Sequence, residues 1–183
     1  MYRTTLTRTM IALAVAFIGS ASTVWAAGKA HEHGTLKLDV AIDGNKLTIA
    51  MEAPLDNLLG FERAPRTEAE RKAAADVLAR LRSPDKGTPL FAADAAAQCT
   101  LSKVEVQAPV LEPGAKPAAK DEHADLDASY EFTCSKPDEL RTLDVGLFDA
   151  YKRTQRIDVQ VAGPKGQAKV TLKRPARKVQ LVR

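Results

Sequence analysis

The sequence of 183 residues lacks the motifs that mark the common enzyme classes. It has no Gly-x-Ser-x-Gly nucleophile elbow, no phosphate-binding P-loop and no dinucleotide-binding glycine fingerprint. Carboxylate side chains are numerous, but no spacing pairs two of them for acid–base chemistry. We therefore expect a protein that is not an enzyme, with a hydrolase that uses an unrecognised carboxylate site as the weaker alternative.

Aromatic residues are also scarce, at 5% of the chain, and no long block of lysine or arginine is interleaved with them. Nucleic-acid-binding surfaces combine basic blocks with aromatic side chains. The formal net charge of +4 includes Arg3 and Arg8 near the N-terminus, so it is only partly a property of the expected folded domain. The composition predicts no nucleic-acid partner.

The sequence has no apolar run long enough to cross a membrane. The longest, Met10–Ile18, is about half of the roughly 20 residues that a spanning helix needs. It follows two arginines and precedes small residues at Val24 and Ala26, which is typical of a cleaved export signal. We predict a signal peptide over residues 1–26 and one exported domain over 27–183, without a membrane span after cleavage. An uncleaved N-terminal anchor is the alternative.

Cysteine is limited to Cys99 and Cys134. In an exported protein an even pair of cysteines usually forms a disulfide, and their wide separation does not match a Cys-x-x-Cys metal motif. We expect a disulfide, with a thiolate metal pair or two free thiols as the alternatives.

Alternating apolar and polar residues predict most of the secondary structure. Residues 34–40 and 46–52 alternate on either side of Asp43-Gly44-Asn45, which predicts a β-hairpin. Similar patterns predict strands over 98–107, 127–134, 140–145, 156–162, 168–172 and 179–182. The third and fourth of these eight expected strands, 98–107 and 127–134, carry the two cysteines, so a bridge would fasten the end of that pair opposite its connecting loop.

One strong helix is predicted, over about 67–82. Thr67 and Glu70 form a capping box, apolar residues from Ala74 to Leu81 share one helical face, and Ser83-Pro84 ends the helix. Residues 54–65 carry apolar anchors between two prolines, which predicts a buried loop or one helical turn. Residues 90–97 suggest a further short turn of helix.

The segment 108–122 is rich in proline, alanine and lysine and predicts a flexible loop. The whole pattern predicts a single α+β domain of mostly antiparallel strands with one main helix. A sheet-and-helix pair of layers or a sandwich-like arrangement would bury its apolar faces.

Histidine, the most common metal ligand besides cysteine, is also scarce, since the chain has three. In an extended segment, His31 and His33 would project to the same side and could face one ion. Zinc takes about four ligands, commonly histidine nitrogens completed by carboxylate or water. The predicted ligands are His31, His33 and His123, completed by Glu122, Asp125 or water.

Two other interpretations of these histidines remain open. The pair near the N-terminus is also typical of a polar lead-in, and His123 of a solvated loop residue. Alternatively, cleavage after Gly28 would give a Lys29-Ala30-His31 N-terminus, whose amine, amides and imidazole suit Cu(II) or Ni(II).

Five segments of the chain form one recognisable combination: 31–34 (HEHG), 57–65 (NLLGFERAP), 123–126 (HADL), 132–134 (FTC) and Leu147-Phe148. This combination resembles one known family, the zinc-regulated periplasmic (ZrgA-like) proteins of Gram-negative bacteria. It spans most of the exported chain, and its first two segments are the most specific.

The resemblance implies a periplasmic zinc-binding accessory protein that assists zinc acquisition or storage. The implied partner is the solute-binding protein of a zinc ABC importer. This chain departs from the family pattern at Arg63, where a histidine is common, and at 108–122, where a histidine-rich tract is common. A periplasmic protein-interaction or scaffold domain without metal, which would bind through edge strands or the apolar residues 55–61, is the alternative function.

Overall fold

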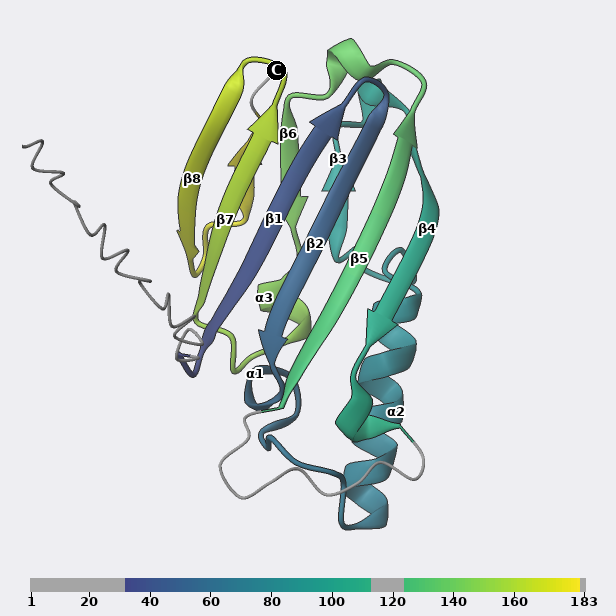
Figure 1. Cartoon of the computed structure of the whole chain (residues 1–183), viewed down its shortest axis with the longest axis vertical. Helices are drawn as coiled ribbons and strands as arrows, with labels where there is room; N and C mark the ends of the chain where they lie inside the picture. Colours follow the sequence, from purple (N-terminus) through teal and green to yellow (C-terminus); the bar gives the residue numbers. More distant parts are fainter. Residues whose placement is uncertain (1–31, 113–123, 182–183) are drawn as a thin grey trace, which may run out of the picture.

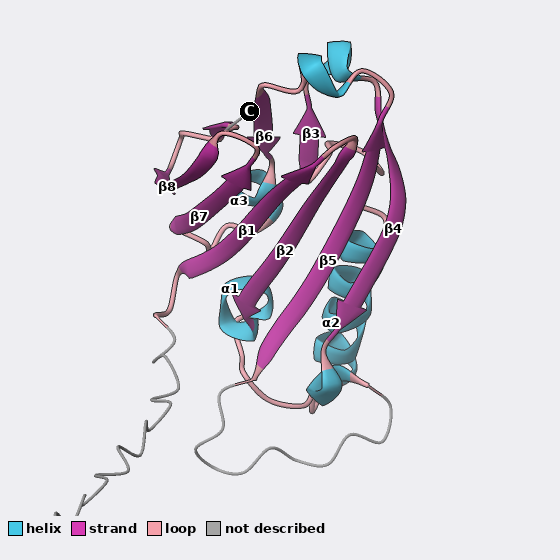
Figure 2. Ribbon diagram, turned by 45° about the horizontal axis from the view of Figure 1, so that its top comes forward, coloured by secondary structure: helices cyan, strands magenta, loops and turns pink. Residues whose placement is uncertain are grey.

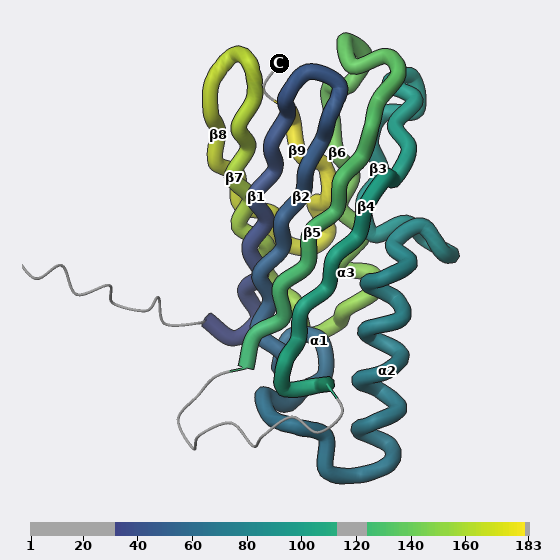
Figure 3. The backbone as a smooth tube through the Cα atoms, turned by 45° about the vertical axis from the view of Figure 1, so that its right-hand side comes forward, coloured from purple at the N-terminus to yellow at the C-terminus, as the bar shows by residue number. Residues whose placement is uncertain are grey.

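Two β-sheets form the frame of the computed structural model, which describes residues 32–112 and 124–181. The larger sheet has six strands (Figure 1), in the order β4 (Cys99–Gln107), β5 (Asp125–Cys134), β2 (Lys46–Pro54), β1 (Thr35–Asp43), β7 (Arg156–Gly163) and β8 (Gly166–Lys173). The smaller sheet has the order β3 (Phe91–Ala93), β6 (Thr142–Val145) and β9 (Lys178–Gln180). Figure 3 shows the smaller sheet behind the larger one. An α+β fold dominated by strands is therefore confirmed.

The predicted hairpin is confirmed as β1 and β2, which pair antiparallel from Lys37 opposite Glu52 to Asp43 opposite Lys46. Gly44 turns the chain with φ +57°, a left-handed conformation that glycine adopts without steric cost. Alternate residues on each strand are buried, so one face of the hairpin joins the core and the other faces outward.

The strands pair mostly antiparallel, as expected, and β1 and β7 are the exception, because they pair parallel with Leu36 opposite Ile157. Parallel strands need a long crossover connection, and here everything from β2 to α3 intervenes. The alternating pattern of residues 156–162 is the same for either direction of pairing, so it cannot reveal this choice.

The main helix is confirmed as α2 (Glu68–Arg82), with Thr67 as its N-cap. The capping box is present: the Glu70 amide donates to Thr67 Oγ1 at 3.1 Å, and the Thr67 amide donates to Glu70 Oε2 at 3.2 Å. Ala74, Leu78 and Leu81 are its buried residues, and Leu78 and Leu81 belong to the hydrophobic core.

The shorter helical segments differ in part from expectation. Residues 54–65 contain the single short helix α1 (Leu55–Leu59), and a second short helix, α3 (Leu147–Ala150), follows β6. The expectation of helix over 90–97 is wrong for β3, because Phe91 pairs with Val145 of β6 and the helical part is confined to a 3₁₀ turn. The 3₁₀ turns are η1 (Ala95–Ala97), η2 (Pro109–Leu111) and η3 (Pro137–Glu139).

Strands β4 and β5 pair antiparallel, and the disulfide joins Cys99 to Cys134, which lie directly opposite each other. The predicted disulfide and its position, away from the connection between the two strands, are confirmed.

The core lies between the two layers, where α2, α3 and the small sheet cover one face of the large sheet. Leu38, Ile49, Tyr130 and Val159 are among its buried side chains and come from four neighbouring strands. The α1 helix lies at the lower end of β2 in Figure 2. Strand β1 begins at the same end of the sheet, because it pairs antiparallel with β2. Of the predicted metal ligands, the two that the structure describes, His33 and Asp125, lie at this end of the large sheet.

Candidate metal centre

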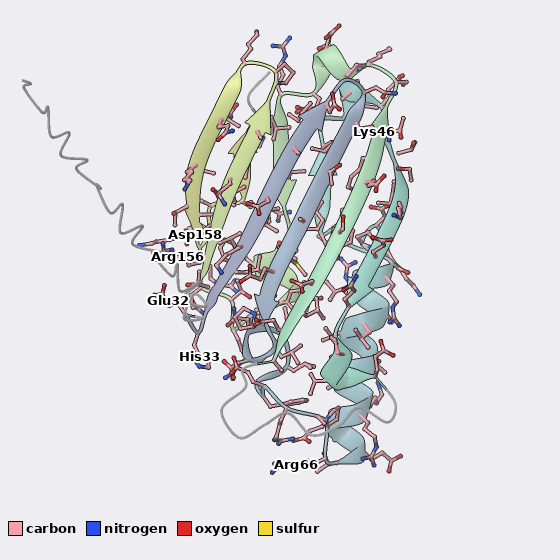
Figure 4. The ribbon with its side chains drawn as sticks, in the orientation of Figure 1. Glu32, His33, Lys46, Arg66, Arg156 and Asp158 are labelled. Atoms are coloured by element: carbon pink, nitrogen blue, oxygen red, sulfur yellow. A yellow bond between two sulfur atoms is a disulfide. The ribbon has the colours of Figure 1, made fainter. Side chains whose placement is uncertain are left out.

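The described part of the histidine stretch is a tight turn at the start of β1, not the extended segment on which the sequence argument relied. The Thr35 amide donates to the Glu32 carbonyl at 2.9 Å, and Gly34 has φ +83°. A residue with a Cβ atom would be strained at this angle. The turn aims His33 beyond the end of β1, and Figure 4 shows His33 and Glu32 at that end, below Arg156 and Asp158.

Asn57 of α1 fixes this turn from one side. Its Oδ1 accepts a hydrogen bond from the Gly34 amide at 2.6 Å, and its Nδ2 donates to the Thr35 carbonyl at 2.7 Å. The side chain is 1% exposed, so water cannot substitute for these bonds without opening the structure.

The segment before β7 fixes the turn from the other side. The Gly34 carbonyl accepts from the amides of Gln155 at 2.8 Å and Arg156 at 3.0 Å. A Cβ atom at Gly34 would lie 3.5 Å from Gln155 Cγ and 3.7 Å from the Arg153 carbonyl oxygen. The backbone that carries His33 is thus held between α1 and the residues that lead into β7.

Two carboxylates approach the His33 imidazole. Nδ1 of His33 lies 3.4 Å from Oδ2 of Asp56 and 3.9 Å from Oε1 of Glu62. The carboxylate side chains are 19% and 15% exposed, whereas His33 is 62% exposed. Asp56 is in the first turn of α1, and Glu62 follows Gly60, whose φ of +84° ends that helix.

These separations are compatible with a shared zinc ion. Ligand atoms that lie about 2.0–2.2 Å from one tetrahedral zinc ion are about 3.3–3.6 Å from each other. The distance of 3.4 Å between His33 Nδ1 and Asp56 Oδ2 falls in this range, and the 3.9 Å to Glu62 Oε1 is slightly longer. Within residues 32–112 and 124–181, no group of three or more His, Cys, Asp or Glu side chains could hold a metal ion as these side chains are placed. His33, Asp56 and Glu62, which we call the His33 cluster, are therefore a partial ligand set.

Of the five predicted ligands, the structure describes two. His31, Glu122 and His123 lie outside the described residues. Asp125 is the first residue of β5 and pairs with Pro54, and the Leu55 amide donates to the Ala124 carbonyl at 3.0 Å. The chain therefore enters the described structure at Glu32 and again at Ala124 at the same end of the sheet, with Asp125 on the opposite side of β2 from β1.

Asp56 and Glu62 were not among the predicted ligands, because the apolar anchors of residues 54–65 predicted only a buried segment. Leu55 is indeed buried, and Leu58 and Leu59 pack against the core. The sequence did hold a signal: Asp56 and Glu62 are two carboxylates on a short segment whose other side chains are mostly apolar and pack in the core.

Arg63, which departs from the family pattern, turns away from the His33 cluster. Its guanidinium donates to both carboxylate oxygens of Glu70, at 3.0 and 2.8 Å, and lies 5.0 Å from the centre of the Phe61 ring. The Arg63 hydrogen bonds, together with those from the amides of Arg66 and Thr67, lower the pKa of Glu70 to about 2. Arg63 therefore stabilises the N-terminal turn of α2 through its hydrogen bonds to Glu70.

Comparisons with known proteins add the family. In the described part of the chain, no helix is long and apolar enough to cross a membrane. No curated protein matches this sequence. The model of one family, described as ZrgA family zinc uptake protein, matches residues 30–181, which include the histidine turn, the α1 segment and the disulfide. This chain therefore belongs to the ZrgA family of zinc uptake proteins.

Proposed function

We propose that the protein is a periplasmic zinc-binding accessory protein, and that it binds zinc at the His33 cluster during zinc uptake. The observation that carries this proposal is the approach of Asp56 Oδ2 to 3.4 Å from His33 Nδ1, with Glu62 Oε1 at 3.9 Å. One nitrogen and two carboxylate oxygens are ligand types that zinc accepts, and they leave a position for a further ligand.

The rigidity of the cluster supports the same proposal. His33 is on a turn held by buried Asn57, and Asp56 is the residue directly before Asn57. Asp56, a proposed ligand, and Asn57, which positions the other ligand His33, therefore belong to the same short helix, α1. Metal sites gain affinity when their ligands are held in place by such supporting hydrogen bonds.

His31 is proposed as the further ligand, because it is two residues from His33 in the sequence. His123 and its neighbouring carboxylates, Glu122 and Asp125, are proposed as an alternative source of that ligand. Support for this alternative comes from Ala124 and Asp125, which lie at the same end of the large sheet as α1. A ligand set without cysteine also suits a protein whose two cysteines form a disulfide.

The proposed role is to hold zinc and pass it to the solute-binding protein of a zinc importer. The zinc uptake description of the family supports this role. The ligand set supports exchange, because a site built from one or two imidazoles and carboxylates releases zinc more readily than one built from thiolates.

The test is a zinc titration of the exported protein, purified without a histidine tag, by competition with a chromophoric chelator. We expect one zinc per chain, and a loss of affinity of more than about tenfold in His33→Ala and in Glu62→Gln. The double variant His31→Ala/His33→Ala should lose binding altogether.

Glu105→Gln is the matched control for Glu62→Gln, because it removes the same charge from an exposed position on β4. It should bind zinc as the wild type does. Equal affinity in the wild type and in His33→Ala would exclude the His33 cluster as the site.

A further inference from the structure

Arg153 contacts the His33 cluster through Asp56. It lies between α3 and β7, and its Nη2 is 3.0 Å from Asp56 Oδ1 and 3.2 Å from Asp56 Oδ2. Its Nε also donates to the Asp56 backbone carbonyl at 2.9 Å. Three contacts with one residue hold the guanidinium in a defined place, although the side chain is 57% exposed.

The surrounding backbone leaves room for the guanidinium at that place. A Cβ atom on Gly60 would lie 3.5 Å from both Cζ and Nη1 of Arg153. The carbonyl oxygen of Arg153 itself lies beside Gly34, the residue after His33. Arg153 thus lies beside the turn that carries His33 and is hydrogen-bonded to Asp56 of α1.

One oxygen is shared between the arginine and the histidine. Oδ2 of Asp56 is 3.4 Å from His33 Nδ1 and 3.2 Å from Arg153 Nη2. A zinc ion bound between His33 and Asp56 would withdraw charge from that oxygen and would be repelled by the guanidinium nearby. Arg153 and a bound zinc ion would therefore compete for the Asp56 carboxylate.

We propose that Arg153 is an internal cation that holds Asp56 when the site is empty and competes with zinc for this carboxylate. The proposal rests on the proposed zinc site at the His33 cluster. Arg153 would keep two neighbouring carboxylates, Asp56 and Glu62, from repelling each other before metal arrives. It would also set the affinity low enough for zinc to leave.

The test compares Arg153→Met with the wild-type exported protein. Methionine keeps an unbranched stem but has neither the charge nor the hydrogen bonds. We expect Arg153→Met to bind zinc at least about tenfold more tightly, because the competing cation is gone. We also expect its metal-free form to melt at a lower temperature, and zinc to raise its Tm by more than it raises that of the wild type.

Arg153→Lys gives a second measurement that does not depend on the folding of the methionine variant. Lysine keeps the positive charge but cannot make the paired hydrogen bonds of the planar guanidinium. The zinc affinity of Arg153→Lys should therefore lie between those of the wild type and Arg153→Met. If Arg153 merely positions Asp56 as a ligand, both variants should bind zinc more weakly than the wild type, and the proposal would be overturned.

Arg156→Met is the control for a general effect of charge. Arg156 lies three residues from Arg153 and contacts Glu32 at 3.5 Å and Asp158 at 2.9 Å. It should leave zinc affinity within about threefold of the wild type, because its partly exposed charge does not contact the ligands and the variant keeps the backbone amide that binds Gly34. Equal tightening in both methionine variants would also overturn the proposal. Absence of zinc binding by the wild type would instead contradict the proposed function.

Discussion

Asn57 holds the backbone of Gly34 from a buried position, with its side-chain oxygen 2.6 Å from the Gly34 amide. Its side-chain nitrogen binds the next carbonyl, that of Thr35, at 2.7 Å. Two segments about twenty residues apart in the sequence are joined in this way, and each carries part of the His33 cluster.

The first prediction concerns this buried amide. Asn57→Ala leaves the Gly34 amide and the Thr35 carbonyl without their partner, which should lower the free energy of unfolding by about 1–3 kcal/mol. Zinc affinity should fall as well, because His33 and Asp56 lose their common support. Urea denaturation and zinc titration measure the two effects. Asn45→Ala, in the exposed turn after β1, should change stability by less than about 0.5 kcal/mol.

The second prediction concerns the start of α3. A Cβ atom on Gly146 would lie 2.2 Å from the carbonyl oxygen of Pro89, so the backbone must move to admit one. Gly146→Ala should therefore destabilise the protein by about 2 kcal/mol or more. Gly44→Ala is the comparison, because Gly44 has φ +57° and no atom within 4 Å of its Cβ position. It should cost about 1 kcal/mol from backbone strain alone, and a larger loss there than at Gly146 would contradict the packing argument.

The third prediction concerns acid stability at the start of α2. Hydrogen bonds from Arg63 and from the Arg66 and Thr67 amides lower the pKa of Glu70 from 4.5 to about 2. A depressed carboxylate pKa stabilises the fold above the unfolded value, and this contribution is lost as the pH falls through about 2. The urea midpoint of the wild type should thus exceed that of Glu70→Gln at pH 7.

The difference between the two proteins should shrink as the pH falls from 4.5 toward 2. Glu68→Gln removes a charge from the same helical turn but none of the Arg63 hydrogen bonds, and it serves as the control. A difference between the wild type and Glu70→Gln that is independent of pH would show that Glu70 acts through packing.

The fourth prediction separates stability from metal binding. Cys99 and Cys134 are 35 residues apart, and the chain-entropy model gives a crosslink of this span about 3–4 kcal/mol. Cys99→Ser/Cys134→Ser should lower the free energy of unfolding by up to this amount. Zinc affinity at a temperature where the variant stays folded should be unchanged, because the disulfide and Asp125 lie at opposite ends of β5. Loss of zinc binding by the folded variant would contradict the placement of the site.

The hairpin and the main helix could be predicted from the sequence, because each is determined by residues close together in the chain. The hairpin of β1 and β2 depends on the turn at Gly44, and α2 depends on Thr67 and Glu70, all of which can be recognised within a few residues. The partner of Cys99 was predictable because the protein has one other cysteine.

The remaining features depend on contacts between distant segments. The parallel pairing of β1 with β7 brings Gly34 to Gln155, and nothing near Gly34 in the sequence shows this. The approach of Asp56 and Glu62 to His33 depends on Asn57, whose hydrogen bonds form only once α1 folds back under β1. From the sequence, His33 was predicted as a ligand and residues 54–65 were recognised as an ordered segment. That segment was predicted to serve the core alone, so its carboxylates were not linked to His33.

The most direct test of the zinc site is anomalous scattering at the zinc absorption edge, measured on crystals of the zinc-loaded protein. We expect one strong peak about 2.0–2.2 Å from an imidazole nitrogen of His33 and from a carboxylate oxygen of Asp56 or Glu62. A peak elsewhere, such as beside Glu52 and Asp127 on the open face of the large sheet, with none at His33, would contradict it.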